Sequence, residues 1–347
     1  MTGNRLTALL GTEVPIVLGA FGGVSSVELT AEVSRLGGLG SYGLYGYDAE
    51  RIATTIAALR EATSAPFAVN LWVPTGDELR PAEVDLDPAL AAAQPLFDAV
   101  GLPQPDPPEA FLPDFDAQIE AVLEARPPVV SFVFGLPEPD VLDRLRDAGI
   151  RILGTATTVD EAVHLTDRGA DAVIATGLEA GGHRVSFLRP AEESLIGAFA
   201  LVPQVRDAVD VPVVAAGGIA DRRGVAAALA LGADGVLVGT AFLRTRQSAA
   251  SEAHRRAIAE AGAAGTVLTR AMSGRLSRGV RNRAVEVLER GGQVAPFPAQ
   301  NWMTGQFRAV ANRDGIGELQ SLWVGQGAGL TQYTEAAEVF AELRAGL

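Results

Sequence analysis

The stretch 211-VPVVAAGGIADRRGVAAALALGADGVLVGTAFL-243 decides the fold. It contains an apolar run, a loop with two glycines, a helical pattern, a further glycine and a second apolar run. The apolar runs at 212–217 and 235–240 show no alternation with polar residues, which is typical of parallel strands buried on both faces. A glycine after a helix supplies the left-handed residue with which many helices end. The stretch therefore predicts a strand–helix–strand unit of a parallel α/β fold.

The same unit recurs along most of the chain. The segment "VPIVLGAFGG" at 14–23 begins one copy, and the likeness between 14–40 and 211–237 is a weak internal repeat of the kind expected in half-barrels. Eight strands with helices between them predict an α/β protein, a (β/α)8 TIM barrel. The candidate strands lie near 15–20, 39–44, 66–73, 129–135, 151–156, 172–176, 212–217 and 235–240.

Two regions fall outside this repeat and are too long to be simple connections. Residues 74–126 are rich in proline and aspartate, with helical patterns near 88–99 and 115–125. Residues 262–347 follow the last helix of the barrel. We therefore expect a barrel made of 1–73 and 127–261, with 74–126 and 262–347 forming a smaller, mostly helical capping domain at its mouth.

Composition excludes several classes of function. The chain of 347 residues is 48% hydrophobic, carries a net charge of −14 and has no cysteine. The acidic balance argues against nucleic acid and anionic membranes as partners. The lack of cysteine excludes thiolate catalysis, disulfides and cysteine-ligated metals. The sequence shows neither a signal-peptide core nor an apolar run long enough to span a membrane, so we expect a soluble, cytoplasmic protein.

Glycines follow the last two candidate strands, as Gly217-Gly218 and as Gly239-Thr240. The active sites of barrels form at the C-terminal ends of the strands, and phosphate is commonly bound after strands seven and eight. Glycine loops let backbone N–H groups approach a phosphate closely. The two loops together indicate a phosphate site, whereas either one alone is better explained as a tight turn.

His183 follows Gly181-Gly182 in the loop after the sixth candidate strand. A histidine at the mouth of a barrel suits proton transfer, because its usual pKa lies near neutrality. A structural loop histidine is the equally weighted alternative. His164 and His254 lie in helical patterns, where we expect solvated side chains. Three scattered histidines do not predict a metal site.

Several segments together resemble one known family. The segments "GADAVIATGLEAGGHR" (169–184), "PVVAAGGIADRRG" (212–224), "SGRLSRGVRN" (273–282) and "LWVGQGAGL" (322–330) are similar to those of the nitronate monooxygenases. The resemblance covers nearly the whole chain apart from the insertion after residue 73. It implies a barrel that binds one FMN without covalent attachment, and no metal.

The resemblance also implies roles for individual residues. Ala20, Phe21 and Gly22 would lie along the flavin, and Asn70 would bond the edge of its ring. Thr176 stands where the family often has a glutamine that bonds the flavin. The remaining implied contacts are Gly181 and Gly182 to the flavin or its ribityl chain, Gly217, Gly218, Gly239 and Thr240 to the phosphate, and Gln326 from the C-terminal segment.

The activity implied by the resemblance is oxidation of alkyl nitronates, and by extension nitroalkanes, by O2 to carbonyl compounds and nitrite. His183 would be the base. An NAD(P)H-dependent flavin reductase acting on quinones or enoyl thioesters is the alternative, because related enzymes share these segments. A phosphate-ligand-binding barrel without catalysis is a third reading. The expected partners are a small-molecule substrate and O2, and the sequence leaves a homodimer open.

Overall fold

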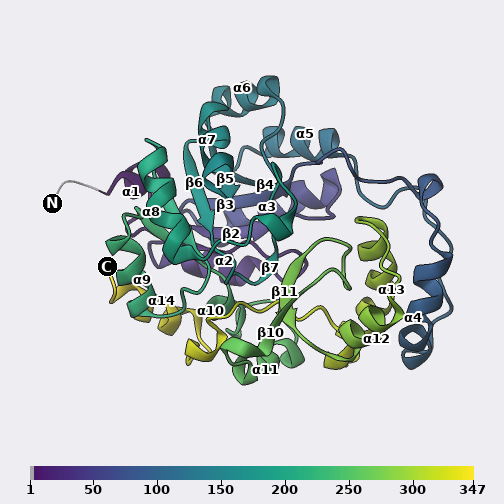
Figure 1. Ribbon diagram of the computed structural model, residues 1–347. Helices are drawn as coiled ribbons and strands as arrows, with labels where there is room; N and C mark the ends of the chain where they lie inside the picture. Colours follow the sequence, from purple (N-terminus) through teal and green to yellow (C-terminus); the bar gives the residue numbers. More distant parts are fainter. Residues whose placement is uncertain (1–3) are drawn as a thin grey trace.

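The computed structural model describes residues 4–347 and shows eight parallel strands arranged as a barrel (Figure 1). Along the barrel wall the strands follow the order β1, β9, β8, β6, β5, β4, β3 and β2. All eight candidate strands are confirmed. Their bounds are β1 (Ile16–Leu18), β2 (Gly40–Gly43), β3 (Phe67–Trp72), β4 (Val129–Val133), β5 (Arg151–Ala156), β6 (Ala172–Thr176), β8 (Val213–Ala216) and β9 (Gly235–Val238).

The first strand closes the barrel on both of its sides. β1 pairs in parallel with β9 along its whole length. On its other side, a bridge joins Val17 to Leu39, just before β2. Leu18 N donates to Leu39 O, and Leu39 N donates to Ile16 O, each at 2.9 Å. The C-terminal ends of all eight strands therefore meet around one rim.

Helices cover the outside of the barrel, and short side chains fix where several of them begin. Ser26 and Asp48 each accept a hydrogen bond from a backbone N–H in the first turn of the helix that follows. The helices between the strands are α2 (Val27–Arg35), α3 (Ala49–Ala62), α5 (Phe115–Ala125), α6 (Pro139–Asp147), α7 (Val159–Asp167), α8 (Ala198–Ala208) and α9 (Arg222–Ala230). The N-terminal helix α1 (Arg5–Leu10) packs Leu6 and Leu10 on the apolar interior of the barrel.

A second hydrophobic cluster lies beside the barrel mouth. Helix α4 (Asp87–Ala99) packs against α12 (Arg283–Gly291) and α13 (Ala299–Arg313), far from it in the sequence, and the three lie together on the right of Figure 1. This cluster forms a cap. Between cap and barrel lies an antiparallel sheet of β10 (Thr266–Thr269), β11 (Ser277–Val280) and the two-residue β7 (Gly182–His183).

Two helices expected in the cap pack on the barrel instead. Helix α5 contacts α3 and α6, and its buried residues belong to the main barrel core. The C-terminal helix α14 (Ala336–Arg344) contacts α2 and α9. We therefore keep the division into barrel and cap as a proposal, with α5 and α14 assigned to the barrel because their apolar faces are buried there.

The remaining elements are short. They are helices α10 (Thr240–Leu243) and α11 (Glu252–Glu260) and the 3-10 turns Pro81–Glu83, Ala191–Glu193, Ala263–Gly265, Gly317–Leu319 and Ala328–Leu330. None of the helices in residues 4–347 is both long and apolar enough to cross a membrane.

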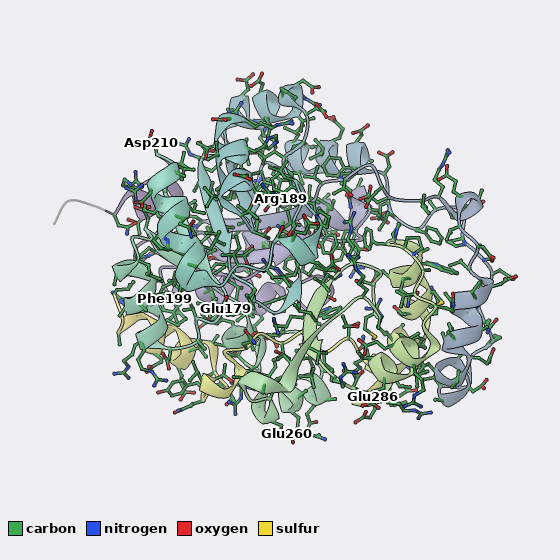
Figure 2. All side chains as sticks on the ribbon, viewed as in Figure 1. Glu179, Arg189, Phe199, Asp210, Glu260 and Glu286 are labelled. Carbon is green, nitrogen blue, oxygen red and sulfur yellow. The ribbon has the colours of Figure 1, made fainter. Side chains whose placement is uncertain are left out.

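The contact of α14 with the barrel can be tested at Phe340. Its ring is buried and packs so closely on Gly38 that a Cβ atom there would lie 2.8 Å from it. Phe340→Ala should lower the free energy of unfolding by about 3–5 kcal/mol, because it leaves a cavity in the core. Phe199→Ala is the matched control, since Phe199 is 76% exposed (Figure 2), and its effect should stay within about 0.5 kcal/mol. Equal effects in denaturant titrations would contradict this packing.

Candidate active site

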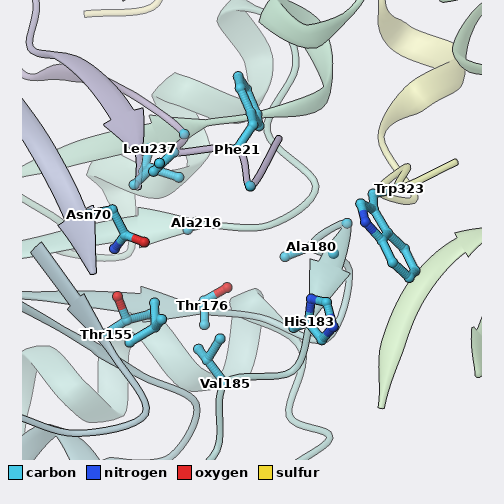
Figure 3. Close-up of a pocket in the computed structure, with 18 of the residues that line it drawn as sticks. Phe21, Asn70, Thr155, Thr176, Ala180, His183, Val185, Ala216, Leu237 and Trp323 are labelled. Atoms are coloured by element: carbon cyan, nitrogen blue, oxygen red, sulfur yellow. The ribbon is translucent and has the colours of Figure 1, made fainter. Parts of the chain in front are cut away.

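One cavity of about 410 Å³ opens at the rim formed by the C-terminal ends of the strands. Its wall is contributed by the loops of the barrel and by the cap. Figure 3 shows Asn70 on one side and His183 with Trp323 on the other, with Thr176 and Ala216 between them. Except for Gln326, every residue singled out in the sequence lines this cavity: Ala20, Phe21, Gly22, Asn70, Thr176, Gly181, Gly182, His183, Gly217, Gly218, Gly239 and Thr240.

One end of the cavity is made of glycine backbone. Gly217 and Gly218 adopt φ values of 101° and 74°, a region that other residues rarely enter. Within residues 4–347, the N–H groups of Gly218, Gly239 and Thr240 donate to no other protein group. Unused N–H donors in a glycine loop are what a bound phosphate requires. This end of the cavity therefore fits the phosphate of FMN.

Polar side chains from neighbouring strands form the middle of the cavity. Asn70 Nδ2 donates to the backbone oxygen of Ser131 at 3.1 Å and to its hydroxyl at 2.9 Å. These bonds fix the amide and leave Asn70 Oδ1 as an acceptor. Thr155 and Thr176 lie across from it in Figure 3. An acceptor beside threonine hydroxyls suits the N–H edge of a planar heterocycle such as the flavin ring.

His183 stands at the opposite end, held by the cap sheet. It is paired with Ser277 in the β7–β11 ladder, and its Nε2 lies 2.7 Å from Ser273 Oγ. Its ring contacts Trp72 edge-on, with centroids 4.9 Å apart, and lies 5.3 Å from Trp323. Burial, followed by the nearby positive charges of two arginines, lowers the pKa of His183 to about 3. The imidazole is therefore neutral at physiological pH.

One orientation of the Ser273 hydroxyl fixes the tautomer of His183. Its hydroxyl lies 3.1 Å from Arg275 O, and it accepts a bond from Arg275 N at 3.3 Å. A hydroxyl has one hydrogen, so when Ser273 donates to Arg275 O, His183 Nε2 must donate to Ser273. Nδ1 is then left as the proton acceptor.

Two charged or polar side chains, Arg184 and His254, are buried. Arg184 is 2% exposed and donates to the backbone oxygens of Gly177, Thr176 and Ser194, at 2.7, 3.3 and 3.2 Å. It fixes the loop that carries His183 and does not steer ligands. The expectation of a solvated His254 was wrong, because this residue is 3% exposed and its Nε2 lies 3.0 Å from Trp323 O.

The structure also shows where His164 and Gln326 lie. His164 is half-buried, with its ring 5.7 Å from that of Phe187. Residues 4–347 contain no group of three His, Asp or Glu side chains placed to hold a metal ion. Gln326 does not line the cavity. Its N–H donates to Glu179 O at 2.9 Å, and its neighbours Gly325 and Gly327 line the wall instead.

Several residues of the cavity wall were not predicted from the sequence. Tyr45, Asn301 and Arg308 line the cavity beside His183, together with Trp72. Ser273 lies in the segment 273–282, which contributes to the family resemblance, but the sequence does not predict its contact with His183. Tyr45 and Trp72 lie at the C-terminal ends of β2 and β3, whereas Asn301 and Arg308 lie on α13, in a stretch without any motif, and only the packing of the cap brings these two to the barrel mouth.

The fold and the cavity define a barrel enzyme with room for a phosphorylated planar cofactor beside a neutral histidine. Comparisons with known proteins specify the family. The family model for nitronate monooxygenase matches residues 3–346, so the chain belongs to the nitronate monooxygenase family, which consists of flavoenzymes. Membership of this family makes the protein an oxidoreductase.

Three relatives illustrate the similarity. A probable nitronate monooxygenase of Staphylococcus aureus (strain JH9) is 39% identical over 325 residues, which are 93% of this chain and 91% of the relative. The structure of a nitroalkane oxidase from Streptomyces ansochromogenes matches with a TM-score of 0.88 and 37% identity, over 99% of this chain and 97% of that one. FabK from Thermotoga maritima matches with a TM-score of 0.76 and 29% identity, over 99% and 96%.

The low pKa of His183 predicts a specific effect of acid on stability. In the unfolded chain this histidine takes up a proton below about pH 6.5, but in the folded, FMN-free protein it does so only near pH 3. Stability is therefore lost as the pH falls below 6.5, by up to about 2 kcal/mol at pH 5. His183→Asn should lose correspondingly less between pH 7 and 5 in urea titrations. An identical loss in both proteins would show that His183 has an ordinary pKa.

The glycine end of the cavity predicts a second effect. Gly218→Val should weaken FMN binding at least about tenfold, because a branched side chain blocks the approach of the phosphate to the backbone. Gly149→Val is the control, since Gly149 has a similar φ of 78°, no atoms within 4 Å of an added Cβ, and no part in the cavity. Fluorescence titration of the FMN-free proteins measures both affinities. Unchanged affinity in Gly218→Val would place the phosphate elsewhere.

Proposed function

We propose that the protein is an FMN-dependent nitronate monooxygenase, which oxidises alkyl nitronates, and nitroalkanes after loss of a proton, by O2 to carbonyl compounds and nitrite. The observation that carries the proposal is a single cavity that joins unused glycine N–H groups, the free acceptor of Asn70 and the neutral ring of His183. Membership of the nitronate monooxygenase family and the likeness to a nitroalkane oxidase support it.

The wall of the cavity suggests how FMN would be held. Gly217-Gly218 and Gly239-Thr240 would bind the phosphate, and Asn70 would accept from the ring. Ala20, Phe21, Gly22, Thr176, Gly181 and Gly182 would line the flavin, with Gly325 and Gly327 in place of Gln326. When bound, FMN supplies the electron transfer and the reaction with O2 that no side chain of the chain can provide.

His183 holds or moves the proton in this scheme. Its neutral Nδ1 can accept the proton on the carbon next to the nitro group of a nitroalkane. A pKa near 3 makes it a weak base for that step. A nitronate has already lost this proton, so the site should favour nitronates over the corresponding nitroalkanes. Trp72, Trp323 and Phe297 enclose the reacting carbon in an apolar wall that excludes water.

The likeness to FabK keeps one alternative in view. In that alternative the protein is an NAD(P)H-dependent flavin reductase acting on quinones or enoyl thioesters. The two functions differ in their products. The proposed function requires wild-type protein loaded with FMN to release nitrite and a carbonyl compound from an alkyl nitronate in air. Rapid NAD(P)H-dependent reduction of a quinone, with no nitrite from a nitronate, would establish the alternative.

One experiment distinguishes His183 acting as a base from His183 only lining the cavity. His183→Asn should slow turnover of a neutral nitroalkane by at most about 10²–10⁴-fold, the contribution of a well-matched general base, because the low pKa of His183 makes it a weak base. Turnover of the pre-formed nitronate should fall much less, since no proton has to be removed. His164→Asn, a substitution outside the cavity, should leave both rates unchanged. Steady-state nitrite release measures all four rates, and equal losses on both substrates would remove His183 from the base role.

A further inference from the structure

Arg308 is a partly buried cation in the wall of the cavity that His183 also lines. It lies on α13, and it donates to Ser321 Oγ and to the Oδ1 and backbone oxygen of Asn301, each at 2.8 Å. Its Nε is shielded from solvent and has no hydrogen-bond partner. Burial lowers the pKa of Arg308 to about 10, so the guanidinium still carries its charge at neutral pH.

Among the described residues, Arg308 differs from Arg275 in forming no ion pair, and from Arg184 in having no glutamate charge nearby to compensate it. Arg275 forms ion pairs with Asp77 at 3.0 Å and with Glu78 at 2.8 Å. Arg184 is held by three backbone oxygens and by the charges of nearby glutamates. Within residues 4–347, Arg308 makes no ion pair with a carboxylate. Because a buried charge without a partner is costly, the cavity retains a positive charge that an anion can neutralise.

A second unused donor lies beside it. Asn301 Nδ2 donates to the hydroxyl of Tyr45 at 2.9 Å, so that the hydroxyl oxygen acts as an acceptor. Burial raises the pKa of Tyr45 to about 12, so its own hydrogen stays in place. No protein acceptor for this hydrogen occurs among the described residues. Tyr45, Asn301 and Arg308 line the same cavity as His183.

We propose that Arg308 and Tyr45 form an anion subsite that takes the two oxygens of a planar oxyanion, the charged head group of the substrate. Arg308 Nη1 keeps one hydrogen that no described protein group accepts, so this hydrogen and that of the Tyr45 hydroxyl can each bind one oxygen of the anion. His183 is neutral and does not compete for the anion. Assigning the oxyanion as a nitronate rests on the proposed function. The subsite selects anionic nitronates over neutral nitroalkanes, quinones and enoyl thioesters.

Nitrate tests the subsite without any turnover, because it is a planar oxyanion that the protein cannot oxidise. Calorimetric titration of sodium nitrate, at fixed ionic strength, is carried out on protein saturated with FMN. Wild type should bind nitrate saturably, and Arg308→Met should bind it about 10–100-fold more weakly, the usual effect of losing a charged hydrogen bond. Arg313→Met is the matched control, since Arg313 ends the same helix, is exposed and pairs with Asp314. It should bind nitrate as wild type does.

The outcomes separate the subsite from the proposed function. No saturable nitrate binding to wild type, or the same dissociation constant in wild type and Arg308→Met, overturns the subsite. Loss of nitrate binding in Arg308→Met, with no oxidation of nitronates by wild type, keeps the subsite and overturns the function. If Arg308→Met does not fold, Tyr45→Phe removes one donor and should weaken nitrate binding several-fold. Unchanged binding in Tyr45→Phe then overturns the subsite.

Discussion

The pairing of the two-residue strand β7 with β11 is the contact on which the site depends. It ties the loop after β6 to the cap and places His183 opposite Ser277. Arg184 N extends the contact by donating to Leu276 O at 2.8 Å. The loop before β7 also packs closely on the C-terminal segment, because a Cβ atom at Gly181 would lie 2.6 Å from Gly325 N. Without this pairing the glycine end of the cavity and Trp72 would remain on the barrel, but His183 would lose its anchor and Trp323 and Arg308 of the cap would not face the cavity.

The cap contributes the positively charged side chains that determine the electrostatics of the cavity. Burial, and after it the charges of Arg275 and Arg308, keeps His183 neutral, and the same positive field favours a bound anion. Arg275 is neutralised by its own carboxylates, whereas Arg308 is not. A weak base beside an unpaired cation is poorly suited to removing protons from neutral carbon acids. It is well suited to holding a substrate that arrives as an anion, and this links the proposed preference for nitronates to the geometry of the site.

The barrel could be predicted from the sequence because its signals are local. Unbroken apolar runs marked the eight strands, and closure of the barrel then brought the residues after each run to one rim, as Asn70 and Gly218 show. Contacts between segments that are far apart in the sequence could not be predicted, because no local pattern of residues marks them. Arg184 and His254 have charged or polar neighbours in sequence, yet both are buried by chain from elsewhere. Helix α5 has an apolar face that suits cap or barrel equally, and only its packing on α3 and α6 decides. Arg308 belongs to no motif, so its unpaired charge becomes visible only in three dimensions.

We propose that one cavity holds FMN and lets an anionic nitronate reduce it. Visible absorption of the FMN-loaded protein, recorded without oxygen after addition of an alkyl nitronate or of NADH, tests this directly. We expect the nitronate to bleach the flavin band much faster than NADH does, and air to restore the band as nitrite appears. Rapid bleaching by NADH, with a nitronate leaving the spectrum unchanged, would contradict it.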